Sequence, residues 1–243
     1  MAPVITSASN ARLKLVRKLV GRRQREKLGL FVCEGEDLVE AALDAGIEPV
    51  EALVDAERPV LADRLRKAEE VQPALMAELS TLGHPPRVIA VFRQADLPRG
   101  FAAPIGLGLW HVADPGNLGT LLRTADALGP AFVALSRGSA DPTAPKALRA
   151  SAGAVFRVPI GRLDEAPRPW FALVASGGQP LWEARLGEGT FVLGAEREGL
   201  PPELLESCEE RVTIPQEPAA ESLNVAVAGA VALYELRRRR LSR

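Results

Sequence analysis

The segment "IGLGLWHVADPGNLGTLLRTADALG", from Ile105 to Gly129, joins an apolar run to a helical pattern through a short polar loop. The apolar run, residues 105–112, predicts a buried strand, and the later apolar residues, at spacings of three and four, predict a helix. A buried strand followed by an amphipathic helix is typical of a parallel sheet that helices cover on both faces. Asn117 and Arg123 stand out in this helix, because a buried helix does not need their polar side chains.

The same alternation continues towards the end of the chain. Apolar runs predict further strands at 131–136, 154–160, 170–176, 190–196 and 211–215, and helical patterns lie at 144–152 and 222–241. Ligands bind outside the carboxyl ends of the strands in such a sheet. Three polar loops follow strands in this way: "ADPGN" (113–117), "GAEREG" (194–199) and "PQEPAAESLN" (215–224). The sequence therefore predicts an α/β fold with a ligand site formed by these loops.

The residues before this sheet predict a smaller α/β domain. It opens with an amphipathic basic helix over residues 8–20. Strands are then predicted at 28–35, 50–55 and 87–94, and helices at 36–46, 58–70 and 73–82. The segment "ADLPRGFAAP", residues 95–104, predicts a linker, because prolines and a glycine interrupt it. We expect one domain over residues 1–97 and a second over residues 105–243.

The positive charge of the chain is unevenly distributed. The formal net charge of the 243 residues is only −1, but basic residues gather between Asn10 and Leu28 and in the terminal "LRRRRLSR". Such clusters at the two ends of a nearly neutral protein indicate contacts with phosphates. The candidate RNA-binding residues are Arg12, Arg22, Arg23 and Arg25.

Several classes of protein are disfavoured by missing patterns. No apolar run is long enough to cross a bilayer and no signal peptide is visible, so we expect a cytoplasmic protein with no membrane segment. Cys33 and Cys208 have no ligand-type spacing, which predicts neither a disulfide nor a metal site. The GxGxxG, GxxxxGK[ST] and GxSxG patterns are absent, which disfavours dinucleotide, P-loop and serine hydrolase chemistry. His111 is interpreted as a strand residue near the end of the sheet.

Three segments together resemble the motifs of a known family. "DPGNLGTLLRTADALG", "FVLGAEREGLPPELLESCEERVTIPQ" and "ESLNVAVAGAVALYELRRRR" are similar to the motifs of the SpoU, or TrmH-like, RNA 2'-O-ribose methyltransferases of the SPOUT superfamily. The N-terminal part is similar to the small RNA-binding domain, of ribosomal-protein L30e type, that precedes the catalytic domain in many members. The resemblance implies a parallel sheet with a deep trefoil knot, a homodimer with its active site at the subunit interface, and S-adenosylmethionine as cofactor.

The resemblance also implies roles for individual residues. Leu193, Gly194, Ile214 and Leu223 match positions that hold the cofactor, and a glycine there lets the backbone approach a ligand closely. The polar positions of the catalytic centre are matched by Asn117, Arg123, Glu196, Ser222 and Asn224. Ser222 and Asn224 are also good N-cap residues for the last helix.

Two features of the motifs leave questions open. Arg123 could act on the hydroxyl as a base or as a clamp for the phosphate; a guanidinium stays protonated in proteins, which favours the clamp. The loop before the last helix departs from the family pattern. It carries Gln216 where relatives usually have an apolar residue, and it lacks a glycine before Ser222.

The predicted function is S-adenosylmethionine-dependent 2'-O-methylation of structured RNA, with 23S ribosomal RNA as the favoured substrate. Transfer RNA is an alternative substrate. A non-catalytic RNA-binding protein of the same fold that acts in ribosome assembly is a hypothesis from another class. An unrelated small-molecule enzyme is disfavoured by the basic ends and the missing phosphate motifs.

Overall fold

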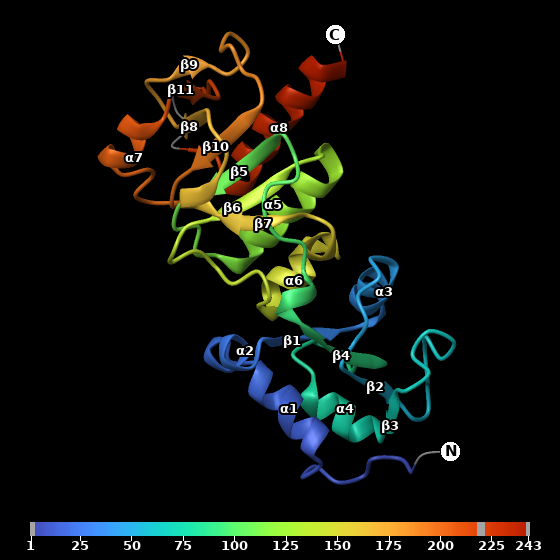
Figure 1. Ribbon diagram of the computed structural model, residues 1–243. Helices are drawn as coiled ribbons and strands as arrows, with labels where there is room; N and C mark the ends of the chain where they lie inside the picture. Colours follow the sequence, from blue (N-terminus) through green and yellow to red (C-terminus); the bar gives the residue numbers. More distant parts are fainter. Residues whose placement is uncertain (1–2, 218–221, 242–243) are drawn as a thin grey trace.

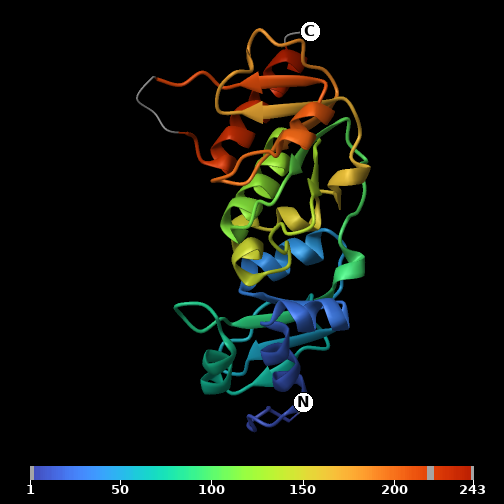
Figure 2. The ribbon, with the colours of Figure 1, turned by 90° about the vertical axis from the view of Figure 1, so that its left-hand side faces the viewer.

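The computed structural model describes residues 3–217 and 222–241, which form two sheets stacked end to end, with the two ends of the chain far apart (Figures 1 and 2). The N-terminal sheet has the strand order β1-β4-β2-β3 and the C-terminal sheet the order β7-β6-β5-β10-β8-β11-β9. No helix within these ranges is both long and apolar enough to span a membrane.

The N-terminal sheet is mixed, because β4 is antiparallel to β1 and β2 whereas β2 and β3 are parallel. Its strands are β1 (Leu30–Glu34), β2 (Glu51–Asp55), β3 (Glu69–Val71) and β4 (Val88–Arg93). The basic segment forms two helices rather than one, since Gly21 starts the second. The helices of this part are α1 (Ala11–Leu19), α2 (Arg22–Leu28), α3 (Glu36–Asp44) and α4 (Pro73–Leu79), and a 3-10 helix, η1 (Gln94–Asp96), follows β4.

The prediction of a helix at residues 58–70 is wrong. Most of this segment forms turns, and its last residues enter β3. The fully buried carboxylate of Asp55 accepts hydrogen bonds from the backbone N–H groups of Glu57 and Arg58, which closes a turn at the end of β2. Leu61 then adopts a left-handed conformation with φ of 54°, which a helix does not allow.

The C-terminal sheet is parallel throughout, as the alternation of apolar strands and helices predicted. Its strands are β5 (Ile105–Leu109), β6 (Phe132–Leu135), β7 (Ile160–Arg162), β8 (Trp170–Val174), β9 (Gln179–Pro180), β10 (Gly189–Leu193) and β11 (Glu210–Thr213). The helices are α5 (Pro115–Leu128), α6 (Pro145–Ser151), α7 (Pro202–Ser207) and α8 (Val225–Leu241), with short 3-10 helices η2 (Ala154–Phe156) and η3 (Leu163–Glu165). The trefoil knot stays a prediction.

The prediction of a strand at residues 154–160 is also wrong. Ala152 and Gly153 are both left-handed, so the chain turns sharply after α6 and enters η2 instead of a strand. The apolar side chains of Val155 and Phe156 are nevertheless buried. An apolar run identified the core correctly here but not the backbone conformation.

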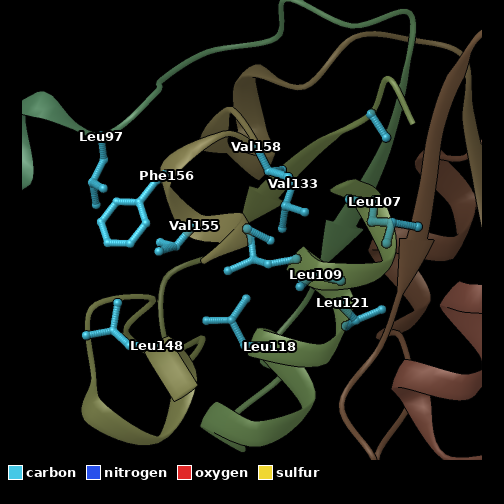
Figure 3. Packing of buried hydrophobic residues seen from close by; sticks show 14 of the residues in the cluster. Leu97, Leu107, Leu109, Leu118, Leu121, Val133, Leu148, Val155, Phe156 and Val158 are labelled. Carbon is cyan, nitrogen blue, oxygen red and sulfur yellow. The ribbon is translucent and has the colours of Figure 1, made fainter. Parts of the chain in front are cut away.

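Helix α5 packs closely between its neighbours. Leu118 and Leu121 face Leu107 and Leu109 of β5 in the core, where the side chains of several elements meet (Figure 3). A Cβ atom on Gly119 would lie 2.4 Å from the carbonyl oxygen of Ala147 in α6, so only glycine allows this approach of the two helices. This packing fixes the start of α5, which carries Asn117.

The two sheets share one apolar core at their junction. The ring of Phe156 lies 6.3 Å from that of Phe31 and 5.9 Å from that of Phe92, both in the N-terminal sheet. At the edge of the junction the buried guanidinium of Arg25 donates from Nη2 to Asp141 Oδ2 at 2.8 Å. Arg25 Nη1 also donates to the carbonyl oxygens of Leu19 and Val20 in the helical segment before it.

We expect Asp141→Asn to destabilise the protein by about 3 kcal/mol, because it leaves the Arg25 charge buried without a counter-charge. Urea unfolding followed by circular dichroism measures the change. Glu26→Gln is the matched control, since Glu26 pairs with Arg22 on the exposed surface, and its effect should stay within about 0.5 kcal/mol. Equal losses in the two variants would contradict a structural role for the buried pair.

Candidate active site

A cavity of about 340 Å³ lies at the carboxyl ends of β8, β10 and β11. Its position follows the rule for parallel sheets, in which the loops after the strands form the ligand site. Leu193, Gly194, Ile214 and Leu223, the four residues predicted to hold a cofactor, all line it. Leu173, Val225 and Ala228 add further apolar surface. One wall of the cavity is therefore suited to a flat apolar group.

The loop after β10 forms a tight bend on one side of this cavity. The backbone N–H of Gly199 donates to the carbonyl oxygen of Ala195 at 2.9 Å, and Gly199 is left-handed with φ of 67°. A Cβ atom on Gly194 would lie 2.2 Å from the carbonyl carbon of Gly199. Glycine at 194 is thus required by the loop itself, and the bend presents Glu196 at the cavity mouth.

Three polar side chains form a hydrogen-bonded chain beside the cavity. Asn117 Nδ2 donates to Glu196 Oε1 at 2.8 Å, and Asn224 Nδ2 donates to Asn117 Oδ1 at 3.1 Å. We call Glu196, Asn117 and Asn224 the Asn117 network. Each member belongs to a different strand-end loop or helix start, so the network ties together segments that are far apart in the sequence.

The ends of two helices hold this network in place. Asn224 Oδ1 accepts the backbone N–H of Ala226 at 2.9 Å, which caps the start of α8. Asp114 Oδ1 accepts the backbone N–H of Asn117 at 2.9 Å and caps α5 in the same way. Lys146 Nζ lies 2.6 Å from Asp114 Oδ2, and this hydrogen bond, together with that from Asn117, lowers the pKa of Asp114. Asp114 therefore remains a charged cap at neutral pH.

The structure does not bring Ser222 and Arg123 into the network. Ser222 lines the cavity and is exposed, and α8 begins after it, so Asn224 rather than Ser222 is the cap. Arg123 is exposed on α5 and does not line the cavity. Its side chain makes no hydrogen bond or ion pair with residues 3–217 or 222–241. A guanidinium in this state is available to a ligand or a second subunit.

The basic residues predicted to bind RNA have different surroundings. The prediction that Arg25 contacts RNA is wrong, because Arg25 is buried against Asp141 at the junction and is only 3% exposed. Arg12 pairs with Glu51 at 2.9 Å and Glu69 at 3.0 Å. Arg22 pairs with Glu26 but stays on the surface. Arg23 is exposed and has no ion pair in the described part of the chain.

The prediction that His111 belongs to a strand is wrong. Strand β5 ends at Leu109, and His111 is left-handed with φ of 50°. Its exposed ring stacks on that of Trp110. Lys146, the only lysine after Lys67, pairs with Asp114, and no pattern in the sequence indicates this contact.

Within the two described ranges, no group of three or more histidine, cysteine, aspartate or glutamate side chains is placed to hold a metal ion. Burial raises the pKa of the Cys33 thiol far above its usual range, and the nearby Glu34 charge adds to this effect. Burial likewise raises the pKa of Cys208. Neither thiol is an activated nucleophile.

A parallel sheet with an apolar cavity and a polar network at its carboxyl edge is the architecture of an α/β ligand-binding enzyme. Residues 104–234 match the model of the SpoU rRNA methylase family, and residues 10–90 match an MRM3-like substrate-binding domain. The chain belongs to the SpoU rRNA methylase family.

Similar proteins align over nearly the whole chain. An uncharacterised tRNA/rRNA methyltransferase from Synechocystis is 37% identical, with 96% of this chain and 93% of the relative covered. The 23S rRNA guanosine 2'-O-methyltransferase RlmP of Bacillus subtilis is 34% identical, with 96% and 98% covered. The crystal structure of an AdoMet-bound rRNA methyltransferase from Sinorhizobium meliloti superimposes with a TM-score of 0.84 at 29% identity, and 98% of each chain is covered.

We expect Glu196→Ala to lower kcat for methyl transfer about tenfold or more, because the Asn117 amide loses the acceptor that orients it. Glu196→Gln keeps an oxygen acceptor and should recover most of the activity. Methyl incorporation from labelled S-adenosylmethionine measures both effects.

Glu198→Ala is the control for this series, since Glu198 lies on the same loop, is exposed and has no hydrogen bond among the residues described. Its activity should equal that of the unmodified protein. A full-rate Glu196→Ala variant, or a loss of melting temperature that accounts for its lower rate, would contradict the positioning role.

Proposed function

We propose that this protein transfers the methyl group of S-adenosylmethionine to a ribose 2'-hydroxyl of 23S ribosomal RNA. The Asn117 network beside the apolar cavity is the observation that carries the proposal, because it places oriented polar groups next to a small-molecule site. The 23S rRNA specificity of the relative RlmP favours ribosomal over transfer RNA.

The cavity fits S-adenosylmethionine in size and chemistry. Its volume of about 340 Å³ lies within the range of roughly 300–1,000 Å³ typical of small-molecule sites. Leu193, Ile214 and Leu223 supply apolar surface for an adenine. Gln216 also lines the cavity, and its buried Oε1 has no hydrogen-bond partner among residues 3–217 and 222–241, so it can accept from a ligand. When bound, the cofactor supplies a methyl group on a positively charged sulfur.

The residues of the chain position the reacting groups. The Asn117 network fixes the loops around the cavity, so the hydroxyl and the methyl group can be held in line. The planar guanidinium of Arg123 suits a bidentate contact with the phosphate next to the target ribose. We assign Ser222, exposed at the cavity, to a contact with the RNA or the cofactor.

We infer that Arg123 contributes to the site of a second subunit. It does not line the cavity of its own chain, and α8, which packs against α5, exposes apolar side chains. Val227, Val231 and Tyr234 are 48%, 37% and 58% exposed and follow one another at helical spacing. A homodimer that buries this face would bring α5 of one subunit to the cavity of the other.

The N-terminal part, residues 1–97, binds RNA in this proposal, and residues 105–243 catalyse the reaction. The match to a substrate-binding domain over residues 10–90 supports this division. Arg23, together with the exposed Lys14 and Lys18, provides uncommitted positive charge for phosphates, whereas Arg12 and Arg22 are partly neutralised. We also propose a cytoplasmic location, which the similarity to the bacterial 23S rRNA methyltransferase RlmP supports.

Transfer RNA as substrate and a non-catalytic role in ribosome assembly are the remaining alternatives. The intact Asn117 network argues against the second, because RNA binding alone does not need it.

We expect methyl incorporation into unmodified 23S rRNA, and we expect Arg123→Lys to reduce it about a hundredfold, because lysine cannot make the bidentate phosphate contact. Cofactor affinity, measured by calorimetry, should not change. Methyl incorporation into tRNA instead of rRNA would contradict the assignment of 23S rRNA as the substrate. Cofactor binding without incorporation into either RNA would favour the assembly protein.

Mixing two inactive variants tests where Arg123 acts. If it serves the partner's cavity, a mixed dimer of Arg123→Lys and Asn117→Ala chains has one intact site. Exchange of subunits should then restore roughly a quarter of the activity. No recovery in a mixture that forms mixed dimers would place Arg123 in the site of its own chain.

A further inference from the structure

A second pocket at the same sheet edge is not used by the proposed reaction. It has a volume of about 530 Å³ and lies beyond β5 and β6. Trp110 and His111 line it with their rings stacked, at a centroid distance of 4.6 Å and an interplanar angle of 3°. Trp110 is half-buried on the core, whereas His111 is exposed.

A backbone hydrogen bond links the wall of this pocket to the wall of the cofactor cavity. The backbone N–H of Trp110 donates to the carbonyl oxygen of Leu193 at 2.8 Å, and Leu193 lines the cavity. Three residues further along from His111, Asp114 caps the helix that carries Asn117. A ligand on the stacked pair would therefore lie beside the catalytic loops.

The backbone of His111 is held in an unfavourable conformation. Its φ of 50° is rare for a residue other than glycine. The backbone N–H of His111 donates to Ser136 Oγ at 2.9 Å, which fixes the residue in this position. Residues held in sparsely populated backbone conformations cluster at binding sites.

Two arginines and one aspartate line the pocket around the stacked pair. Arg137 lines the pocket, is exposed, and its side chain has no hydrogen bond within residues 3–217 and 222–241. Arg162 and Asp164 also line it and are hydrogen-bonded to each other. This contact lowers the pKa of Asp164, and the charge of Arg137 adds to the effect. Arg137 is thus the cation available to a ligand of the pocket.

We propose that Trp110 and His111 form a stacking platform for an unpaired nucleobase of the RNA, next to the nucleotide that is methylated, with Arg137 contacting a phosphate beside it. Parallel rings with an adjacent free guanidinium suit a base and its phosphate, because every base has a π-face that stacks on such side chains. This assignment rests on the proposed function in that RNA is the substrate.

Binding of a short fluorescein-labelled single-stranded RNA, compared with the blunt duplex of the same sequence, tests the platform. His111→Gly removes the ring and also accepts the positive φ, so the fold should be kept. We expect it to weaken single-strand binding roughly tenfold, to leave duplex binding unchanged and to leave cofactor affinity unchanged. His111→Asn also tolerates the positive φ but has no ring, so it should weaken single-strand binding to the same extent.

Arg137→Ala is the companion variant. It should weaken the binding of both the single strand and the duplex and flatten the salt dependence of binding, as loss of a phosphate contact does. The platform is overturned if His111→Gly binds single strands normally, if it weakens single strand and duplex equally, or if the unmodified protein does not prefer single strands. Failure of the proposed function has a different signature: no methyl incorporation into 23S rRNA by the unmodified protein, whatever its RNA affinity.

Discussion

The Asn117 side chain is the point at which three distant segments of this chain meet. It donates to Glu196 in the loop after β10 and accepts from Asn224 before α8. Its own backbone N–H is held by the cap of α5. The cavity between these segments is bounded by the loop at Gly194 and by Leu223, so its shape depends on how they are tied together. Side-chain amides suit this task, because one group can donate and accept at once.

At the junction of the two sheets, one arginine side chain also makes several hydrogen bonds at once. The ring of Phe156 packs against the core of the N-terminal sheet. The guanidinium of Arg25 donates hydrogen bonds to Asp141 and to carbonyl oxygens in the helical segment before it. A buried ion pair of this kind is costly to break, so the two parts form a continuous body. In the proposed function, this body would hold an RNA bound to the N-terminal part at a defined distance from the cavity.

Much of the fold could be predicted from the order of apolar runs. The parallel sheet, its covering helices and the strand-end position of the cavity follow from that order. Two segments could not be predicted in this way, because residues 58–70 are governed by the buried Asp55 and residues 154–160 by the left-handed turn after α6. Both depend on contacts that a local pattern does not contain.

The candidate site was predictable to a different degree at each residue. Asn117, Glu196 and Asn224 were expected at one centre from the family resemblance, and their side chains are hydrogen-bonded to one another. The burial of Arg25 was not predictable, since the charge pattern does not reveal which basic residue meets Asp141, over a hundred residues away in the chain. The stacking of Trp110 on His111 depends on a backbone conformation that tertiary contacts impose.

If the Asn117 network holds the cofactor loops as one unit, substitutions within it are energetically coupled, and a double-mutant cycle measures this coupling. Cofactor affinity would be measured by calorimetry for Asn117→Ala, Asn224→Ala and the double variant. We expect each single change to weaken cofactor binding and the double change to be little worse, with a coupling free energy of about 1 kcal/mol or more. Additive effects of the two substitutions would contradict it.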